Sequence, residues 1–171
     1  FPVRVVRGNS NVGPSRARNH LLSTATSDYV HFHDADDWFA PGWCETIRQH
    51  LEKARPDLVV TEVASIDAEG VEAMTVLNLA AVTPDTLVAR AIRGSLLVPS
   101  TTFRRELGLA IGGYREALLQ AEDYEFSIRL CAAAHSVQLL PRPLVRIRVH
   151  DGSRSRDAGV VYRCALESLS M

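Results

Sequence analysis

Two spacings of apolar residues alternate along the chain. Short apolar runs predict strands at residues 3–7, 29–33, 57–63, 95–102, 137–140 and 144–149. Helical spacing predicts helices at residues 14–26, 83–93 and 122–134, and another that begins after residue 42. Residues 65–82 are irregular, as in a hairpin. Strands that alternate with helices favour an α/β fold with a mostly parallel sheet.

The predicted strand at residues 57–63 has the character of a central strand. Leu58, Val59 and Val60 are consecutive apolar residues, the pattern of a strand that is buried on both faces. We expect residues 1–156 to form one domain and residues 157–171 to form a tail that is partly helical.

The composition indicates a soluble globular domain. Of the 171 residues, 46% are hydrophobic and 23% are charged, which excludes a disordered chain. The formal net charge of −1 gives no broad positive field, so we expect no nucleic-acid partner. No apolar run approaches the roughly 20 residues of a membrane-spanning helix. The three cysteines are scattered without a Cys-x-x-Cys spacing, which argues against a zinc site or disulfides and fits the cytoplasm.

An acidic cluster follows the predicted strand at residues 29–33. Asp34, Asp36 and Asp37 stand directly after it, and open α/β sheets bind ligands at the carboxyl ends of their strands. Crowded carboxylates repel each other, and a divalent cation such as Mg²⁺ or Mn²⁺ relieves that repulsion and can bridge two phosphates. An acidic turn that caps the next helix has the same pattern, so this motif alone leaves both interpretations open.

Two further groups of polar residues stand out. Glu122 and Asp123 open the helix predicted at residues 122–134, where the helix dipole favours acidic residues for stability alone. His31 and His33 share one face of a strand, and we expect these imidazoles to be hydrogen-bonded rather than bound to a metal.

Three motifs, taken in order, resemble the family 2 glycosyltransferases of the GT-A fold. Those enzymes carry an asparagine–glycine loop, an Ala-Arg-Asn helix and a strand that ends in Asp-x-Asp-Asp. The same elements occur here in the same order, as Asn11-Val12-Gly13, Ala17-Arg18-Asn19 and Asp34-Ala35-Asp36-Asp37. The resemblance implies a GT-A (nucleotide-diphospho-sugar transferase) fold, with a mostly parallel central sheet flanked by helices. Residues 1–156 would be part of its catalytic domain, in an N-terminally truncated fragment that lacks the first strand–helix unit.

The resemblance also implies roles for the motif residues. Asp36 would be the main metal ligand, and Asp34 would hold the metal or the ribose of the donor. Asn11, Arg18 and Asn19 would lie at the donor.

Inverting members of the family carry an acidic pair like the one at residues 122–123. Asp123 would then be the general base that takes the proton of the acceptor hydroxyl, with Glu122 as an orienting group or as the alternative base. Near the end of the chain, His150 would be a further metal ligand, and Ser153 and Arg154 would contact the donor diphosphate.

The resulting hypothesis is an inverting, Mn²⁺- or Mg²⁺-dependent bacterial glycosyltransferase, hexosyltransferase-like, of polysaccharide biosynthesis. It would move a sugar from a nucleotide-sugar donor to a hydroxyl of a saccharide or lipid-linked acceptor. The resemblance implies that this donor is a UDP-sugar. The expected location is the cytoplasm or the periphery of the membrane's inner face.

Two alternatives stay open at this stage. One is an inactive transferase-like domain that binds a nucleotide or a partner. The other is a metal-dependent phosphohydrolase that uses Asp34 as nucleophile and Asp36 as acid. Such an enzyme normally needs a lysine beside the phosphate, whereas Lys53 falls in a predicted helix away from the motif.

Overall fold

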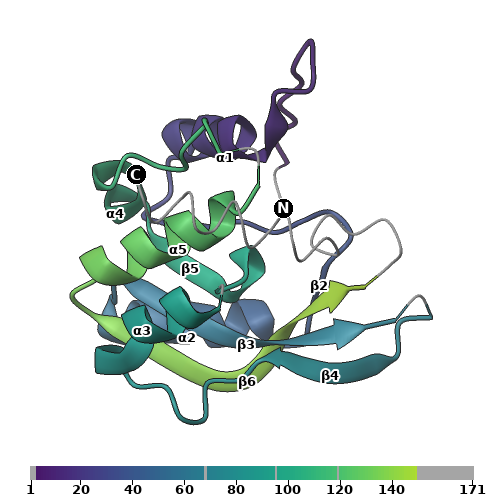
Figure 1. Cartoon of the computed structure of the whole chain (residues 1–171), viewed down its shortest axis with the longest axis vertical. Helices are drawn as coiled ribbons and strands as arrows, with labels where there is room; N and C mark the ends of the chain where they lie inside the picture. The colour runs from purple at the N-terminus through teal and green to yellow at the C-terminus, as the bar shows by residue number, and fades with distance from the viewer. Residues whose placement is uncertain (1–2, 68, 95, 119, 150–171) are drawn as a thin grey trace.

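The computed structural model describes residues 3–67, 69–94, 96–118 and 120–149. It forms one mixed sheet with helices on both faces (Figure 1). In chain order the elements are α1 (Gly13–Thr24), β1 (Tyr29–His31), β2 (Trp38–Phe39), α2 (Trp43–Ala54), β3 (Leu58–Ile66), β4 (Glu72–Leu77), the 3₁₀ turn η1 (Pro84–Thr86), α3 (Leu87–Arg93), the 3₁₀ turn η2 (Val98–Ser100), β5 (Thr101–Arg104), α4 (Arg105–Ala110), α5 (Glu122–Ala133) and β6 (Val137–Arg148).

The strands pair in the order β1-β5-β3-β6-β2, and β4 also pairs with β3. Among these described strands, only the β3–β6 pair is parallel. The expectation of a mostly parallel sheet is therefore wrong. Apolar runs show where strands lie but not their direction, and the short turn between β3 and β4 allows only an antiparallel pair.

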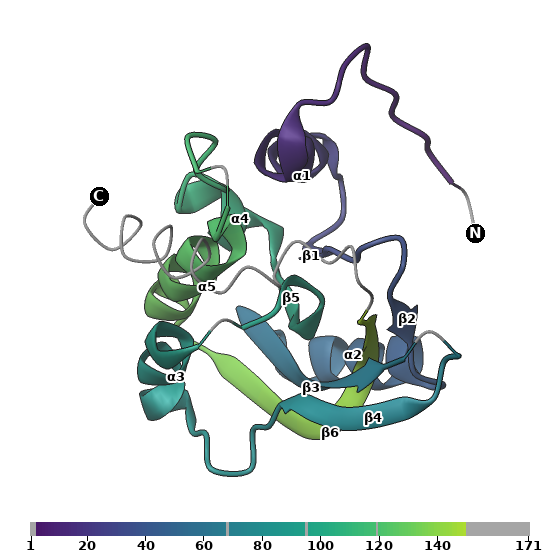
Figure 2. The ribbon, with the colours of Figure 1, turned by 45° about the vertical axis from the view of Figure 1, so that its right-hand side comes forward.

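The core is organised around β3, which is buried along its whole length as its apolar run predicted. Val59 packs with Ile47 of α2 on one face of the sheet. Leu58 and Val60 belong to the larger cluster on the other face, together with side chains of α3 and α5. Figure 2 shows the same division, with α2 on one side of β3 and β6 and with α3 and α5 on the other.

β6 is one strand of 12 residues where two strands were predicted. Its register against β3 slips in the middle, because Thr61 pairs with Leu140 whereas Glu62 pairs with Pro143. Proline has no N–H to donate, so prolines within a strand collect at such irregularities. Pro141 and Pro143 lie between the two strands that the sequence predicted, but in the structure they mark a bulge within one continuous strand.

Other elements differ from the predicted ones. Residues 3–7 form no strand, and Val3 and Val5 remain 83% and 70% exposed, because no described strand pairs with them. Within the strand expected at residues 95–102, residues 98–100 form a 3₁₀ turn, and β5 starts only at Thr101. The hairpin suggested for residues 65–82 is present as the end of β3 and β4. None of the helices in the described ranges has the length and apolar character needed to cross a membrane.

Candidate functional site

The acidic cluster forms a turn that follows β1. The N–H of Asp37 donates to the carbonyl of Asp34 at 3.2 Å, and the side chains of Asp34 and Asp36 are exposed. Asp37 is half-buried, and its Oδ1 accepts a hydrogen bond from the N–H of Arg148 at 3.1 Å. Burial, together with the charges of Asp34 and Asp36, raises the pKa of Asp37 to about 6 although the Arg148 N–H opposes the shift. The turn is thus a concentrated negative site next to the end of β6.

The two histidines before this turn lie in an aromatic cluster. His31 Nδ1 lies 3.1 Å from Thr102 Oγ1, and its Nε2 lies 3.4 Å from His33 Nδ1. Burial, with a contribution from His33, lowers the pKa of His31 to about 3, so this imidazole is neutral. His33 stacks on Phe39 with 3.8 Å between ring centroids, and its Nε2 is buried without a hydrogen-bond partner in the described structure. Both ring nitrogens of His31 therefore have hydrogen-bond partners, as expected, whereas only Nδ1 of His33 has one.

Arg18 connects the acidic turn to the second acidic pair. Its Nη2 lies 3.2 Å from Asp34 Oδ1, and its Nη1 lies 3.2 Å from Glu122 Oε1. The guanidinium also lies over the ring of Tyr114, with its carbon 5.3 Å from the ring centroid. Residues from α1, from the turn after β1 and from the start of α5 therefore form one cluster, and three of the predicted site residues are members of it.

The second acidic pair opens α5 as predicted. Ala121, before the helix, has a left-handed backbone with φ of 58°, and Glu122 is only 7% exposed. Burial and the neighbouring charge of Glu122 raise the pKa of Asp123, while the Tyr124 N–H, which donates to Asp123 Oδ1 at 2.8 Å, and the charge of Arg18 oppose the shift. A carboxylate with a raised pKa is a stronger base than one in water, which suits proton abstraction near neutral pH.

Asn19 holds the turn that precedes α5. Its Nδ2 donates to the carbonyl of Tyr114 at 2.8 Å, and its Oδ1 accepts from the N–H of Tyr114 at 2.7 Å. The same Nδ2 lies 3.2 Å from Glu116 Oε1. Both ends of the Asn19 amide are thus engaged inside the protein, while the donor contact predicted for Asn19 remains a prediction.

An ion cluster around the buried Glu125 of α5, which the sequence analysis missed, supports the same turn. Arg129 Nε lies 2.5 Å from Glu125 Oε1, and Arg115 Nε lies 2.9 Å from the same oxygen. Arg129 also donates to the carbonyls of Ile111 and Gly113 at 2.6 and 2.7 Å. The signal in the sequence was the spacing of Glu125 and Arg129, which places them four apart on one helix face.

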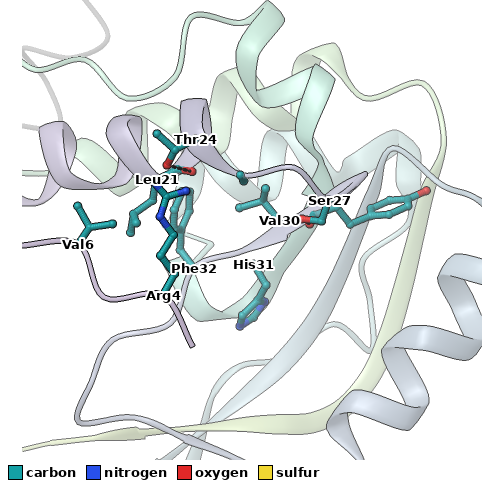
Figure 3. A pocket seen from close by; sticks show the side chains of 10 residues that line it. Arg4, Val6, Leu21, Thr24, Ser27, Val30, His31 and Phe32 are labelled. Atoms are coloured by element: carbon teal, nitrogen blue, oxygen red, sulfur yellow. Dashed lines mark hydrogen bonds between the residues drawn. The ribbon is translucent and has the colours of Figure 1, made fainter. Parts of the chain in front are cut away.

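Two surface hollows lie beside α1. The first, of about 390 Å³, lies between residues 4–6, the end of α1 and β1; Figure 3 shows Val6, Leu21, Val30 and Phe32 around it. None of the predicted acidic site residues lines it. The second, of about 380 Å³, lies at the start of α1 and is lined by Asn11, whose Oδ1 accepts from the N–H of Gly13 at 3.0 Å.

The structure describes only some of the residues that were predicted to bind a metal ion. Within the described ranges, no group of three or more His, Cys, Asp and Glu side chains is arranged to hold a metal ion. His150, Ser153 and Arg154 lie outside the described residues, so their roles stay predictions. The lysine that a phosphohydrolase would need is not beside the turn, because Lys53 lies in the last turn of α2.

Comparison with known sequences gives a consistent result. The family model described as "Glycosyl transferase family 2" matches residues 1–106. An uncharacterized glycosyltransferase of Haemophilus influenzae is 31% identical over 140 residues, covering 76% of this chain and 45% of the relative. The amylovoran biosynthesis glycosyltransferase AmsE of Erwinia amylovora is 27% identical over 164 residues, covering 95% of this chain and 60% of the relative. The chain thus spans about half of the length of the relatives it matches.

Solved structures show the same fold. A crystal structure of residues 1–349 of TarS from S. aureus superposes with a TM-score of 0.66 and 20% identity, covering 92% of this chain and 45% of that chain. The same protein in complex with UDP-GlcNAc gives a TM-score of 0.66 with 19% identity, covering 89% of this chain and 44% of that one. The predicted GT-A fold is confirmed, apart from the direction of its strands.

Proposed function

The chain belongs to glycosyl transferase family 2, and on that premise we propose that it transfers a sugar from a nucleotide-sugar donor to an acceptor hydroxyl with inversion, with the help of a divalent metal. The TarS complexes with UDP and UDP-GlcNAc favour a uridine diphosphate donor. The names of AmsE and of the succinoglycan biosynthesis protein ExoU favour a polysaccharide product.

One observation carries this proposal: Arg18 contacts both acidic sites. Its two 3.2 Å contacts place Asp34, which belongs to the predicted donor side, in the same cluster as Glu122, which belongs to the predicted acceptor side. A transferase that inverts in a single displacement needs a leaving diphosphate on one side of the sugar and a base on the other. The proposal is supported by the fact that one arginine brings both kinds of carboxylate into a single cluster.

Asp123 is the residue best suited to act as the base. Its half-buried carboxylate has a raised pKa and stands at the start of α5 beside Glu122. In the proposed reaction Asp123 takes the proton of the acceptor hydroxyl as that oxygen forms a bond to the anomeric carbon. The bond from this carbon to the diphosphate oxygen breaks, and the diphosphate leaves with the electron pair. Glu122, paired with Arg18, orients the acceptor.

The acidic turn fits a divalent cation by the chemistry of its donors. Asp34 and Asp36 present exposed carboxylate oxygens, which suit Mg²⁺ or Mn²⁺. Burial is the main cause of the raised pKa of Asp37, and the negative charges of Asp34 and Asp36 add to it, so a cation would find three carboxylates close together in this turn. Asp36 and Asp34 would hold the ion, with His150 as a further ligand. Bound there, the ion would offset the negative charge that develops on the leaving diphosphate.

Calorimetry with UDP, with and without Mn²⁺, tests the donor site. We expect binding that depends on Mn²⁺ and that disappears in Asp36→Ala. Asp85→Ala is the matched control, because it makes the same change at an exposed acidic residue of η1. Equal UDP binding in wild type and Asp36→Ala would contradict the metal assignment.

Turnover tests the assignment of the base. Asp123→Asn keeps the shape of the side chain and removes the proton acceptor, so we expect it to bind UDP normally and to lose roughly 100-fold or more of the transfer rate. Glu122→Gln makes the matching change at the other carboxylate and shows which of the two residues is the base. If Asp123→Asn keeps its rate while Glu122→Gln loses it, Glu122 is the base.

A further inference from the structure

The side chain of Arg18 is largely buried and is already paired with carboxylates within the protein. Its side chain is 13% exposed, and that of Glu122 is 10% exposed. Burial alone would lower the pKa of Arg18, but the charges around it, which include those of Asp34 and Glu122, raise it. The guanidinium is therefore held as a permanent positive charge in a part of the site from which most water is excluded.

Most contacts of Arg18 come from α5 and from a residue packed on it. Tyr114 lies under the guanidinium and stacks on Phe126 of α5 with 4.0 Å between ring centroids and 14° between ring planes. Glu122, which binds Nη1, belongs to the same helix. Within the described part of the chain, the contact with Asp34 is the one that reaches elsewhere, to the turn after β1. Arg18 thus ties the acidic turn to the helix that carries Asp123.

We propose that Arg18 is a positioning residue of the transfer reaction, which fixes the acidic turn against the start of α5 and offsets the charge of Glu122 so that Asp123 can act as the base. This assignment rests on the proposed function and goes beyond the donor contact implied by the family resemblance. Arg18 acts through its neighbours and need not touch the substrate.

The charges around Asp123 explain why Arg18 is needed. Glu122 on α5 and Tyr114 on the preceding turn face Asp123 together with Arg18 of α1. The negative charge of Glu122 disfavours a second negative charge next to it, and Arg18 is the positive group that counteracts it. Without Arg18, a nearly buried Glu122 would lose its partner, and Asp123 would hold its proton up to a higher pH.

Carboxyl-carbon NMR of the full chain labelled at aspartate measures this effect without any turnover. The Asp123 signal is identified by its loss in Asp123→Asn. We expect Arg18→Gln to raise the pKa of Asp123 relative to wild type and Arg18→Lys, which keeps the charge, to leave it near the wild-type value. Arg16→Gln is the matched control, since Arg16 lies on the same helix in an exposed 3.0 Å pair with Glu116 and should change nothing. An unchanged Asp123 pKa in Arg18→Gln would overturn the charge role.

Kinetics with the donor that binds then tests the positioning role. We expect Arg18→Lys to lower kcat by roughly tenfold or more with little change in the donor KM, because an ammonium cannot bind two carboxylates with a planar fork. In Arg18→Gln the acid limb of kcat/KM should move to higher pH, together with the NMR titration. A loss of melting temperature with normal kcat and an unshifted limb would make Arg18 a purely structural residue. Absence of turnover in the folded wild type would instead count against the proposed function, and the NMR titration would still decide the role of Arg18.

Discussion

Replacing Asn19 by alanine tests whether this residue stabilises the fold or binds the donor. The substitution removes both hydrogen bonds between the side-chain amide and the backbone of Tyr114, which measure 2.8 and 2.7 Å. A hydrogen bond of this kind contributes about 1 kcal/mol net, so the two give about 2 kcal/mol. The third contact, to the exposed Glu116, adds little. We expect Asn19→Ala to lower the free energy of unfolding by about 2 kcal/mol.

Urea denaturation followed by circular dichroism measures this loss as a shift of the midpoint at an unchanged slope. Asn19→Asp is the informative second variant, because its oxygen still accepts from the Tyr114 N–H while the donor to the Tyr114 carbonyl is gone and a negative charge faces Glu116. It should therefore also be destabilised. Asn11→Ala, an exposed site with one local hydrogen bond, is the mild control. If Asn19→Ala unfolds at the wild-type urea concentration but binds UDP more weakly, Asn19 is a donor ligand and the structural assignment fails.

Three further predictions concern the same turn and the histidine cluster. Gly112→Ala should cost about 1 kcal/mol in thermal unfolding because of its φ of +82°. Gly113→Ala should cost clearly more, because its Cβ would also clash with Oδ1 of Asn19, and equal losses in the two variants would contradict this. Arg129→Met should destabilise the chain by about 3 kcal/mol in urea, since it removes one of two cations from the buried Glu125, and a loss below about 1 kcal/mol would show that the remaining cation suffices. The folded state lowers the pKa of His31 to about 3, so between pH 6.5 and pH 3 the unfolded state binds more protons at this residue than the folded state does. The folded state is therefore destabilised as the pH falls from 6.5 toward 3, by at most about 1.4 kcal/mol per pH unit, and is not destabilised by His31 above pH 6.5. Denaturation at pH 7 and pH 5 should therefore show a smaller pH effect in His31→Gln than in wild type, and an equal effect would mean that His31 is protonated in the folded chain.

The sequence predicted those parts of the fold that depend on local pattern. The unbroken apolar run of β3 identified a strand buried on both faces, and helical spacing placed α1 and α5 within a few residues of their observed bounds. Strand direction was not predictable, because the apolar pattern of a strand is the same for a parallel and an antiparallel neighbour. The bulge at Pro143 was taken for a break for a similar reason: a missing N–H weakens a pairing locally, and only the partner strand shows that the pairing resumes.

The candidate site was predicted as a set of residues but not as a set of contacts. The motifs singled out Asp34, Arg18 and Glu122 separately, and the structure shows that Arg18 contacts both carboxylates, while the roles of all three stay predictions. The partners of Arg18 and Asn19 lie far away in the sequence, and no local spacing shows that Asn19 would form hydrogen bonds with Tyr114. Such pairings are determined by how the helices pack on the sheet.

The contacts that join the candidate site also set an order for its assembly during synthesis. Arg18 and Glu122 are 104 residues apart, and Asp37 and Arg148 are 111 residues apart. Contacts of such long range form late, because large loops must close before any favourable interaction is gained. On the ribosome, the turn at residues 34–37 emerges long before α5 and β6 can hold it. A nascent chain that stalls before residue 122 would therefore expose the acidic turn without the helix to which Arg18 ties it.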